Sequence, residues 1–271
     1  MKPHISQLLQ YATVSLNITN KDLFSWTGTG FFVDALDETK TKRIPLLITS
    51  KHILENGETL TFQIRTQNDK GEPQQIDQFK VQISDLQKAC IYHPSKDVDI
   101  AAVSIAFLMN NALKQGKKIF TAPFTLNLIP NETTEKTLLA MEEIISIGYP
   151  DNLWDSANNL PLFRKGITSS NPTFNYNGRE EFLMDIPDLP GTSGSPVLIY
   201  TQTNLGVKDG KMQQGGRLIL LGVLSSSIVD DIEDDSTPIN INLTTVIKAR
   251  KIFDLFKLIS PLSNAEEKIE K

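Results

Sequence analysis

Short runs of branched and aromatic residues, each bounded by turn-forming residues, recur along most of this 271-residue chain. Runs of this length and composition between turns are typical of β-strands. The turns themselves use pairs such as Asn56-Gly57 and Asn177-Gly178, which favour chain reversal. We therefore expect a mainly β protein, with strands at residues 12–18, 30–35, 45–49, 60–65, 80–83, 100–106, 143–147, 181–186, 196–200 and 218–225.

These runs fall into two groups, and the stretch between them is patterned more weakly. From about residue 110 to residue 135, lysines and other polar residues interrupt the apolar pattern, which indicates a connector. The division predicts one domain in residues 1–130, connector included, and a second in residues 131–271. Near the C-terminus a helical stripe predicts a terminal helix followed by a polar tail; the stripe consists of Val246, Ala249, Phe253 and Phe256.

The charge balance and the cysteine count exclude several classes of protein. The chain carries 27 basic and 32 acidic residues, a formal net charge of −5. A protein that binds nucleic-acid phosphates needs a basic surplus, so we expect no nucleic-acid partner. The single cysteine, Cys90, cannot close an intrachain disulfide, and three histidines with one thiol make no zinc cluster. We expect neither a metal nor another cofactor.

No stretch of the sequence resembles a membrane span or a signal peptide. The longest stretch without a polar residue runs from Leu218 to Leu224, whereas a transmembrane helix needs about 20 apolar residues. The N-terminal residues also lack the apolar run of a secretory signal. We therefore expect a cytoplasmic protein without membrane contact.

Three short stretches carry side chains suited to nucleophilic catalysis. His52 stands at the end of one apolar strand, and Asp97 and Asp99 precede another. Ser193 lies in a glycine-rich turn before a third strand. Glycine at position 191 permits a backbone in which the N–H groups of Gly191 and Ser193 converge on a developing oxyanion. Taken alone, His52 is better explained as a structural or surface histidine and the acids as exposed turn residues. The serine stretch alone is as compatible with an ordinary glycine-rich turn.

The order of the three stretches favours catalysis over these separate readings. Histidine, aspartate and serine follow one another in the chymotrypsin order. The distances along the chain from His52 to Asp99 and from Asp99 to Ser193 are close to those of that template, about 45 and about 93 residues. Five short motifs are similar to those of one family: Gly28–Val33, Thr49–His52, Asp99–Ala101, Ile147–Pro150 and Gly191–Pro196. From about residue 12 to residue 258, the chain resembles the trypsin-like, chymotrypsin-fold serine peptidases. The closest resemblance is to their bacterial branch, which includes the high-temperature-requirement proteases, here without a PDZ domain.

This resemblance implies an all-β fold of two six-stranded antiparallel β-barrels with a C-terminal α-helix. The first barrel would carry His52 and Asp99, and the second would carry Ser193. The implied activity is that of a serine endopeptidase, in which Ser193 attacks, His52 transfers the proton and Asp99 orients the imidazole. The N–H groups of Gly191 and Ser193 would form the oxyanion hole. Asp97 remains an alternative to Asp99, because residues two apart in a strand face the same way.

Departures from the family pattern bear on activation and specificity. Thr192 stands where the trypsin branch has an aspartate, and no Ile-Val-Gly-Gly activation site is present near the start. We therefore expect no activation by N-terminal cleavage. Any control would come from partner binding, as by an activating or regulatory protein, from loop ordering or from substrate access. Pro187 replaces the aspartate of the trypsin S1 pocket, and small residues form the opposite wall, which predicts a small or medium apolar P1 residue. The expected substrate-binding residues are Pro187, Ser225, Ser226 and Ser227; Asp185 and Asp188, which flank Pro187, leave an acidic pocket open.

Two other functions are compatible with the same residues. One is a latent protease effector whose site a partner protein must order, and the other is a non-catalytic binding module with a trypsin fold. The complete set of His52, Asp99, Ser193 and Gly191 favours the peptidase, acting on protein or peptide substrates.

Overall fold

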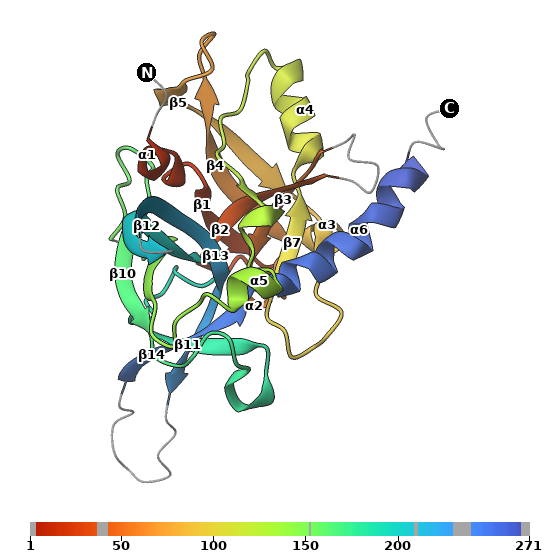
Figure 1. The fold of residues 1–271 in the computed structure, drawn as a ribbon. Coiled ribbons are helices and arrows are strands. Elements are labelled where there is room, and N and C mark those ends of the chain that lie inside the picture. Colours follow the sequence, from red (N-terminus) through yellow and green to blue (C-terminus); the bar gives the residue numbers. More distant parts are fainter. Residues whose placement is uncertain (1–3, 37–42, 152, 209–210, 230–239, 267–271) are drawn as a thin grey trace.

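The computed structural model describes residues 4–36, 43–151, 153–208, 211–229 and 240–266, and strands dominate it (Figure 1). The strands of the first half are β1 Thr13–Thr19, β2 Ser25–Leu36, β3 Arg43–Thr49, β4 Thr59–Gln67, β5 Pro73–Ile83, β6 Cys90–Tyr92, β7 Ala101–Ser104 and β8 Phe124–Thr125. They form an eight-stranded sheet in the order β5-β4-β1-β2-β3-β7-β6, with β8 paired to β2. Neighbouring strands along this path are antiparallel, and β8 runs parallel to β2.

The second half is a closed barrel. Its strands are β9 Glu143–Gly148, β10 Leu162–Thr168, β11 Glu181–Asp185, β12 Pro196–Lys208, β13 Lys211–Val229 and β14 Asn240–Lys248. They follow one another around the barrel in the order β10-β11-β14-β13-β12-β9, and every pair is antiparallel.

The predicted all-β, chymotrypsin-like fold is confirmed, and the six-stranded barrel of the second half is present as expected. The first half differs from a plain six-stranded barrel, because β6 extends the sheet beyond β7 and the two-residue β8 adds beside β2. The division into domains at residues 1–130 and 131–271 stays a prediction.

Helices are short except at the C-terminus. They are α1 Ile5–Leu9, α2 Lys51–Leu54, α3 Leu86–Ala89, α4 Ala106–Lys114, α5 Glu132–Glu135 and α6 Ile252–Glu266, with 3-10 turns η1 Leu126–Leu128, η2 Tyr176–Gly178 and η3 Ala249–Lys251. The terminal helix is present, but it begins later than the stripe from Val246 predicted, because β14 continues to Lys248. Its buried face consists of Ile252, Leu255, Phe256 and Ile259, whereas Phe253 is exposed.

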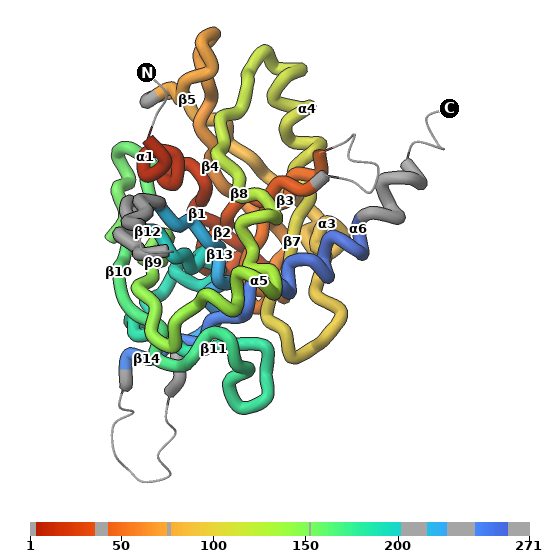
Figure 2. The backbone as a smooth tube through the Cα atoms, in the orientation of Figure 1, coloured from red at the N-terminus to blue at the C-terminus, as the bar shows by residue number. Residues whose placement is uncertain are grey.

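One hydrophobic cluster joins the two halves and α6. Val33 and Ile48 of the first sheet pack in the same cluster as Leu220 of the barrel and Leu255 of the helix, all of them fully buried. Full burial of such a side chain stabilises the fold by roughly 1.5–3 kcal/mol. Figure 2 shows α6 leaving the barrel and returning along the first half, where it contacts β6. This shared core holds the halves in one relative position, so a site between them can be rigid.

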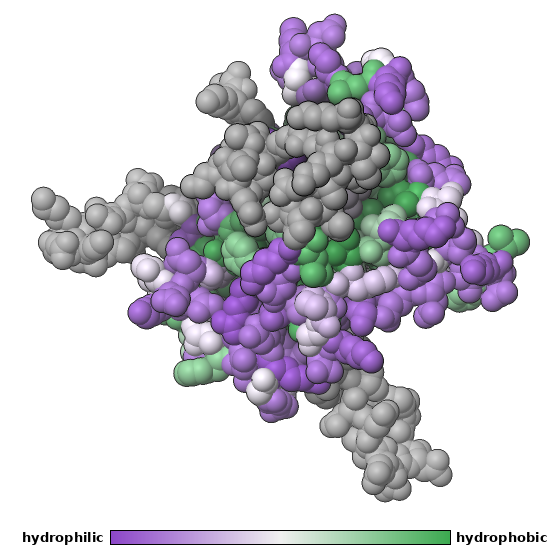
Figure 3. Space-filling model, turned by 90° about the vertical axis from the view of Figure 1, so that its right-hand side faces the viewer, coloured by the Kyte–Doolittle hydropathy of each residue, from purple (hydrophilic) through white to green (hydrophobic). Residues whose placement is uncertain are grey.

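Hydrophilic side chains cover most of the described surface on the face shown in Figure 3. In the described part of the chain, no helix combines the length and the apolar character that crossing a bilayer requires.

Candidate active site

His52 lies in α2, the single helical turn that directly follows β3. Its Nδ1 is 2.7 Å from Asp99 Oδ2, and its backbone N–H donates to Asp99 Oδ1 at 2.9 Å. A carboxylate beside Nδ1 favours the tautomer that carries its proton there. The other ring nitrogen, Nε2, is then a proton acceptor. Since 43% of the His52 side chain is exposed, a substrate can reach this nitrogen.

Asp99, and not Asp97, is the carboxylate in contact with His52. Both acids lie in the loop before β7 rather than in a strand, so the alternation rule does not give them a common face. The Asp97 side chain is exposed and has no hydrogen-bond partner among the described residues. Asp99 also accepts a hydrogen bond from Ser225 Oγ at 2.6 Å, so three donors hold its two oxygens.

Opposing effects set the pKa values of this pair. Burial alone would lower the pKa of His52 and raise that of Asp99. The mutual hydrogen bond and charge outweigh burial, so the His52 pKa is raised above its usual value and the Asp99 pKa is lowered. The negative charges of Asp188 and Glu55 raise the His52 pKa further. The pair is thus set to stabilise a positive charge on the imidazole.

Ser193 lies in the loop between β11 and β12, whose backbone passes through two glycines with positive φ. Gly191 has φ +86° and Gly194 has φ +89°, a region that other residues rarely adopt. A Cβ at Gly194 would also collide with Thr29 O and Thr49 Oγ1. Glycine at this position therefore lets the loop lie directly against β2 and the end of β3, which leads to His52.

Three backbone N–H groups of this loop donate hydrogen bonds, and two have no partner among the described residues. Those of Thr192, Gly194 and Ser195 donate to the carbonyl oxygens of Leu189, Leu224 and Thr192, at 3.0, 2.8 and 3.0 Å. Those of Gly191 and Ser193 have no hydrogen-bond partner in the part of the chain that the structure describes. Buried or half-buried N–H groups are rarely left without a partner in a folded protein. Two such groups, one on Ser193 itself and the other two residues before it, are suited to binding an oxyanion.

A junction on β13 brings the three segments together. Leu224 O accepts hydrogen bonds from Gly194 N and from Ser50 Oγ, both at 2.8 Å. Gly194 directly follows Ser193, and Ser50 precedes His52 by two residues. The next residue on β13 is Ser225, which contacts Asp99. One dipeptide therefore connects all three segments, although Ser193 Oγ and His52 Nε2 form no hydrogen bond with each other among the described residues. Such bonds are often long in free enzymes and tighten when substrate binds.

The residues predicted to bind substrate lie at the edge of this arrangement. Pro187 O accepts from Arg164 Nη1 at 2.6 Å, and the neighbouring Asp188 accepts from Thr192 Oγ1 at 2.9 Å. Ser225 is turned toward Asp99, Ser226 is exposed, and the side chain of Ser227 lies outside the described residues. The exposed Asp185 ends β11.

Sequence reasoning missed Ser50, Arg164 and Asp151, of which the last lies beside Gly191. No motif marks Arg164 or Asp151, and the motif that contains Ser50 gives it no role, because each acts through a contact with a residue distant in the chain. Among the described residues, no group of three or more His, Cys, Asp or Glu side chains could hold a metal ion. The expectation of no cofactor stays a prediction.

Comparisons with known proteins show the family and the fold of this chain. The family model described as trypsin-like peptidase domain matches residues 28–207. The HtrA-type protease AlgW, solved with a tripeptide, is similar in fold, with a TM-score of 0.52 and 13% sequence identity over 95% of this chain and 64% of that one. The structure of HL collagenase has a TM-score of 0.54 and 12% identity over 93% of this chain and 94% of that one. The chain thus spans 64% of the AlgW chain, and no curated protein matches it in sequence.

Proposed function

This chain belongs to the family of trypsin-like peptidase domains, and we propose that it is a serine endopeptidase that uses His52, Asp99 and Ser193. The family predicted from the motifs is confirmed. The observation that carries the proposed activity is the pair of N–H groups at Gly191 and Ser193 that have no partner among the residues the structure describes. They lie in the loop of Ser193, which is linked through Leu224 O to the segment that carries His52, the partner of Asp99.

In the acylation step, Ser193 Oγ attacks the carbonyl carbon of the scissile peptide bond while His52 Nε2 takes the hydroxyl proton. The carbonyl oxygen becomes negatively charged and accepts hydrogen bonds from the N–H groups of Gly191 and Ser193. Loss of one such donor typically lowers kcat by about 10²–10³-fold. Asp99 stabilises the imidazolium that forms at the same moment.

The tetrahedral adduct then collapses, and His52 Nε2 gives its proton to the leaving amine as the C–N bond breaks. An acyl-enzyme ester on Ser193 remains. Water attacks this ester, His52 takes a proton from the water, and the second tetrahedral adduct releases the carboxylic acid. The proton returns to Ser193 Oγ, which restores the starting state.

The loop around Thr192 supports a site that needs no new N-terminus. Thr192 Oγ1 contacts Asp188 Oδ1 at 2.9 Å and Leu189 O at 2.7 Å, and the Leu189 N–H donates to the same hydroxyl at 3.2 Å. These bonds close the loop on itself at the position where the trypsin branch pairs an aspartate with a newly cut amine. The absence of N-terminal activation is therefore part of the proposal, and control by a regulatory protein stays a prediction.

The charges near Pro187 support a neutral P1 residue. Arg164 donates to Pro187 O, and the negative charge of the adjacent Asp188 acts on the Arg164 guanidinium. The positive charge of Arg164 and the negative charge of Asp188 balance each other beside Pro187. Neither a basic nor an acidic P1 side chain therefore meets an uncompensated charge there. We accordingly propose protein or peptide substrates with a small or medium apolar P1 residue.

Labelling with a fluorophosphonate probe tests the activity, since the probe reacts only with a serine activated by an adjacent base. We expect the wild type to be labelled, Ser193→Ala and His52→Ala to remain unlabelled, and Ser156→Ala, which changes an exposed loop serine, to behave as wild type. Folded wild-type protein without labelling would contradict the peptidase and point to a latent effector or a binding module. Labelling that survives Ser193→Ala would show that another residue is the nucleophile.

A further inference from the structure

We propose that Thr27 and Asp151 form a clamp that positions the Gly191 N–H for catalysis. The inference rests on the proposed function and adds two positioning residues to it. Thr27 lies in β2 of the first half, and Asp151 follows β9 of the second half. Thr27 Oγ1 donates a hydrogen bond to Asp151 Oδ1, so the clamp joins the two halves at the surface beside the Ser193 loop.

Asp151 sets the orientation of the peptide unit that ends in the Gly191 N–H. The Asp151 N–H donates to Pro190 O at 2.8 Å. Pro190 O and the Gly191 N–H belong to one planar trans peptide, in which the carbonyl and the N–H point in opposite directions. The bond to Pro190 O therefore turns the Gly191 N–H away from Asp151 and leaves it without a partner among the described residues.

Asp151 also supports Gly191 by direct packing. A Cβ at Gly191 would lie 2.7 Å from Asp151 Oδ1 and 2.5 Å from Tyr149 O, so these oxygens stand against the glycine with no space between. The Asp151 oxygen that touches Gly191 is the one that Thr27 holds. A shift of this carboxylate would therefore allow Gly191 to shift with it.

Thr29, two residues along β2, holds the other end of Gly191. Thr29 Oγ1 donates to Gly191 O at 2.8 Å and accepts from Tyr149 N at 3.0 Å. Residues two apart in a strand face the same way, so Thr27 and Thr29 reach the same loop. Thr29 acts on the Gly191 carbonyl directly, and Thr27 acts on the N–H side through Asp151.

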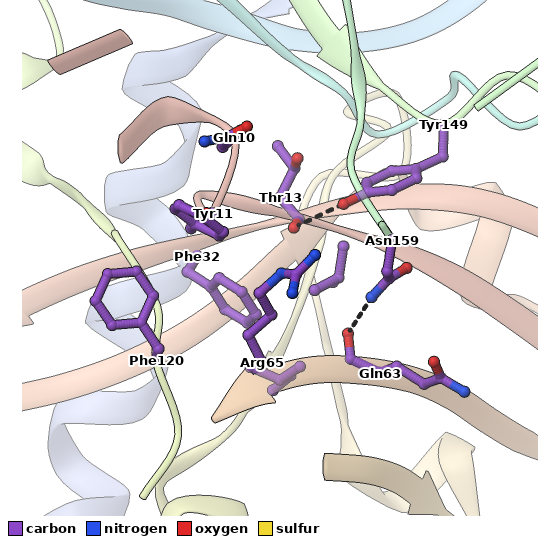
Figure 4. Close-up of a pocket in the computed structure, with 11 residues that line it drawn as sticks. Gln10, Tyr11, Thr13, Phe32, Gln63, Arg65, Phe120, Tyr149 and Asn159 are labelled. Atoms are coloured by element: carbon purple, nitrogen blue, oxygen red, sulfur yellow. Dashed lines mark hydrogen bonds between the residues drawn. The ribbon is translucent and has the colours of Figure 1, made fainter. Parts of the chain in front are cut away.

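The segment that carries Asp151 begins at Tyr149, whose side chain is held by a hydrogen bond to the first half. Tyr149 points into the first half, where its hydroxyl donates to Thr13 O at 3.2 Å (Figure 4). Tyr149 is fully buried, whereas Asp151 is exposed. Beyond Tyr149 the chain is therefore held in place by the Thr27 and Pro190 contacts of Asp151. Because the Thr27–Asp151 bond lies at the surface, its loss should leave the fold intact and act on Gly191.

Steady-state kinetics of Thr27→Val tests the clamp, because valine keeps the shape of threonine and removes the donor. With a peptide amide substrate selected on the wild type, we expect kcat to fall about tenfold and KM to change less than about twofold. The Ki of a peptide aldehyde, whose adduct carries an oxyanion, should rise by about the same factor as kcat falls. Thr27→Ser should restore the wild-type values. Thr61→Val, which removes a hydroxyl from β4, is the matched control and should leave kcat unchanged.

Asp151→Ala removes the acceptor of the same hydrogen bond and should show the same fall in kcat and the same rise in Ki. It keeps the test decisive if Thr27→Val folds poorly. An active wild type with unchanged kcat and Ki in both variants would overturn the clamp alone. A Thr27→Ser enzyme as slow as Thr27→Val would also overturn it, since the retained hydroxyl would then fail to restore the kinetics. A folded wild type that neither hydrolyses peptides nor reacts with fluorophosphonate would overturn the proposed function, and the clamp with it.

Discussion

Three small hydroxyl side chains connect the segments around His52 and Ser193. Ser225 donates to Asp99, Ser50 donates to Leu224 O, and Thr29 donates to Gly191 O. All three residues are buried, with exposed fractions of 6%, 0% and 0%. Removal of such a hydroxyl leaves a buried acceptor without its donor, which costs about 1–3 kcal/mol. At this scale, the geometry of the site therefore depends on three buried hydroxyl groups that hydrogen-bond between its segments.

The pH dependence of activity belongs to this scale, because single charges set the pKa of His52. Asp188 raises that pKa, and Asp188→Asn removes its negative charge. The His52 pKa should then fall, so the neutral, proton-accepting imidazole should persist to lower pH. We expect the acid limb of the kcat/KM profile to move to lower pH in this variant.

The matched control for this pH shift is Asp185→Asn, since Asp185 is exposed and is not among the main charges that raise the His52 pKa. Profiles of wild type and both variants should be recorded at constant ionic strength, because salt screens such charges. An acid limb that stays in place in Asp188→Asn, or moves equally in both variants, would contradict the assignment.

Among the secondary-structure elements, α6 ties the barrel to the first half. Its Ile252 and Leu255 are fully buried in the cluster that both halves share. On its other side, Asp254 Oδ2 is 3.3 Å from Nε2 of the buried His93, which lies in the segment leading to Asp99. The helix therefore supports the loop that carries Asp99.

The packing of α6 predicts a large stability difference between two leucines of one helix. Leu255→Ala should lower the free energy of unfolding by about 2–5 kcal/mol, because it leaves a cavity in the shared core. Leu258→Ala should cost less than about 1 kcal/mol, since 42% of Leu258 is exposed. Urea unfolding followed by fluorescence measures both values. Equal losses in the two variants would mean that α6 does not pack as described.

The element scale is also where sequence reasoning was incomplete. The strand β10 was not predicted, because Arg164, Lys165 and Gly166 interrupt its apolar pattern and both of its faces are partly exposed. The end of β14 was taken for the start of a helix, since Val246 and Ala249 also fit helical spacing. Pairing of β14 with β11 and β13 decides for the strand, and such pairing is not visible in a local pattern.

At the scale of the whole molecule, the site is assembled across the two halves. The first sheet supplies His52 and Asp99, the barrel supplies Ser193, and Gly194 lies directly against β2 and β3. The Thr29 N–H donates to Ser193 O at 2.9 Å across the same boundary. A change that separates the halves should therefore remove activity along with stability.

Gly194→Ala tests this assembly, because the new Cβ would collide with Thr29 O and Thr49 Oγ1 at a positive φ. We expect a loss of about 2–4 kcal/mol in the free energy of unfolding and at least a hundredfold loss of kcat/KM. Gly178→Ala is the matched control, since Gly178 also has a positive φ but no atom within 4 Å of the added Cβ. It should cost only about 1 kcal/mol and keep full activity. Full activity in Gly194→Ala would contradict the described contact between the halves.

The sequence by itself determined the fold family, the mainly β architecture and the set of residues to consider, because these follow from local patterns and short motifs. Only the tertiary structure decided that Asp99 rather than Asp97 contacts His52, and that the N–H groups of Gly191 and Ser193 have no partner within the described part of the chain. It alone brought Thr27 to Asp151, two residues on opposite halves of the molecule. The physical reason is that hydrogen bonds between distant segments depend on how whole sheets pack, and no local pattern encodes that packing.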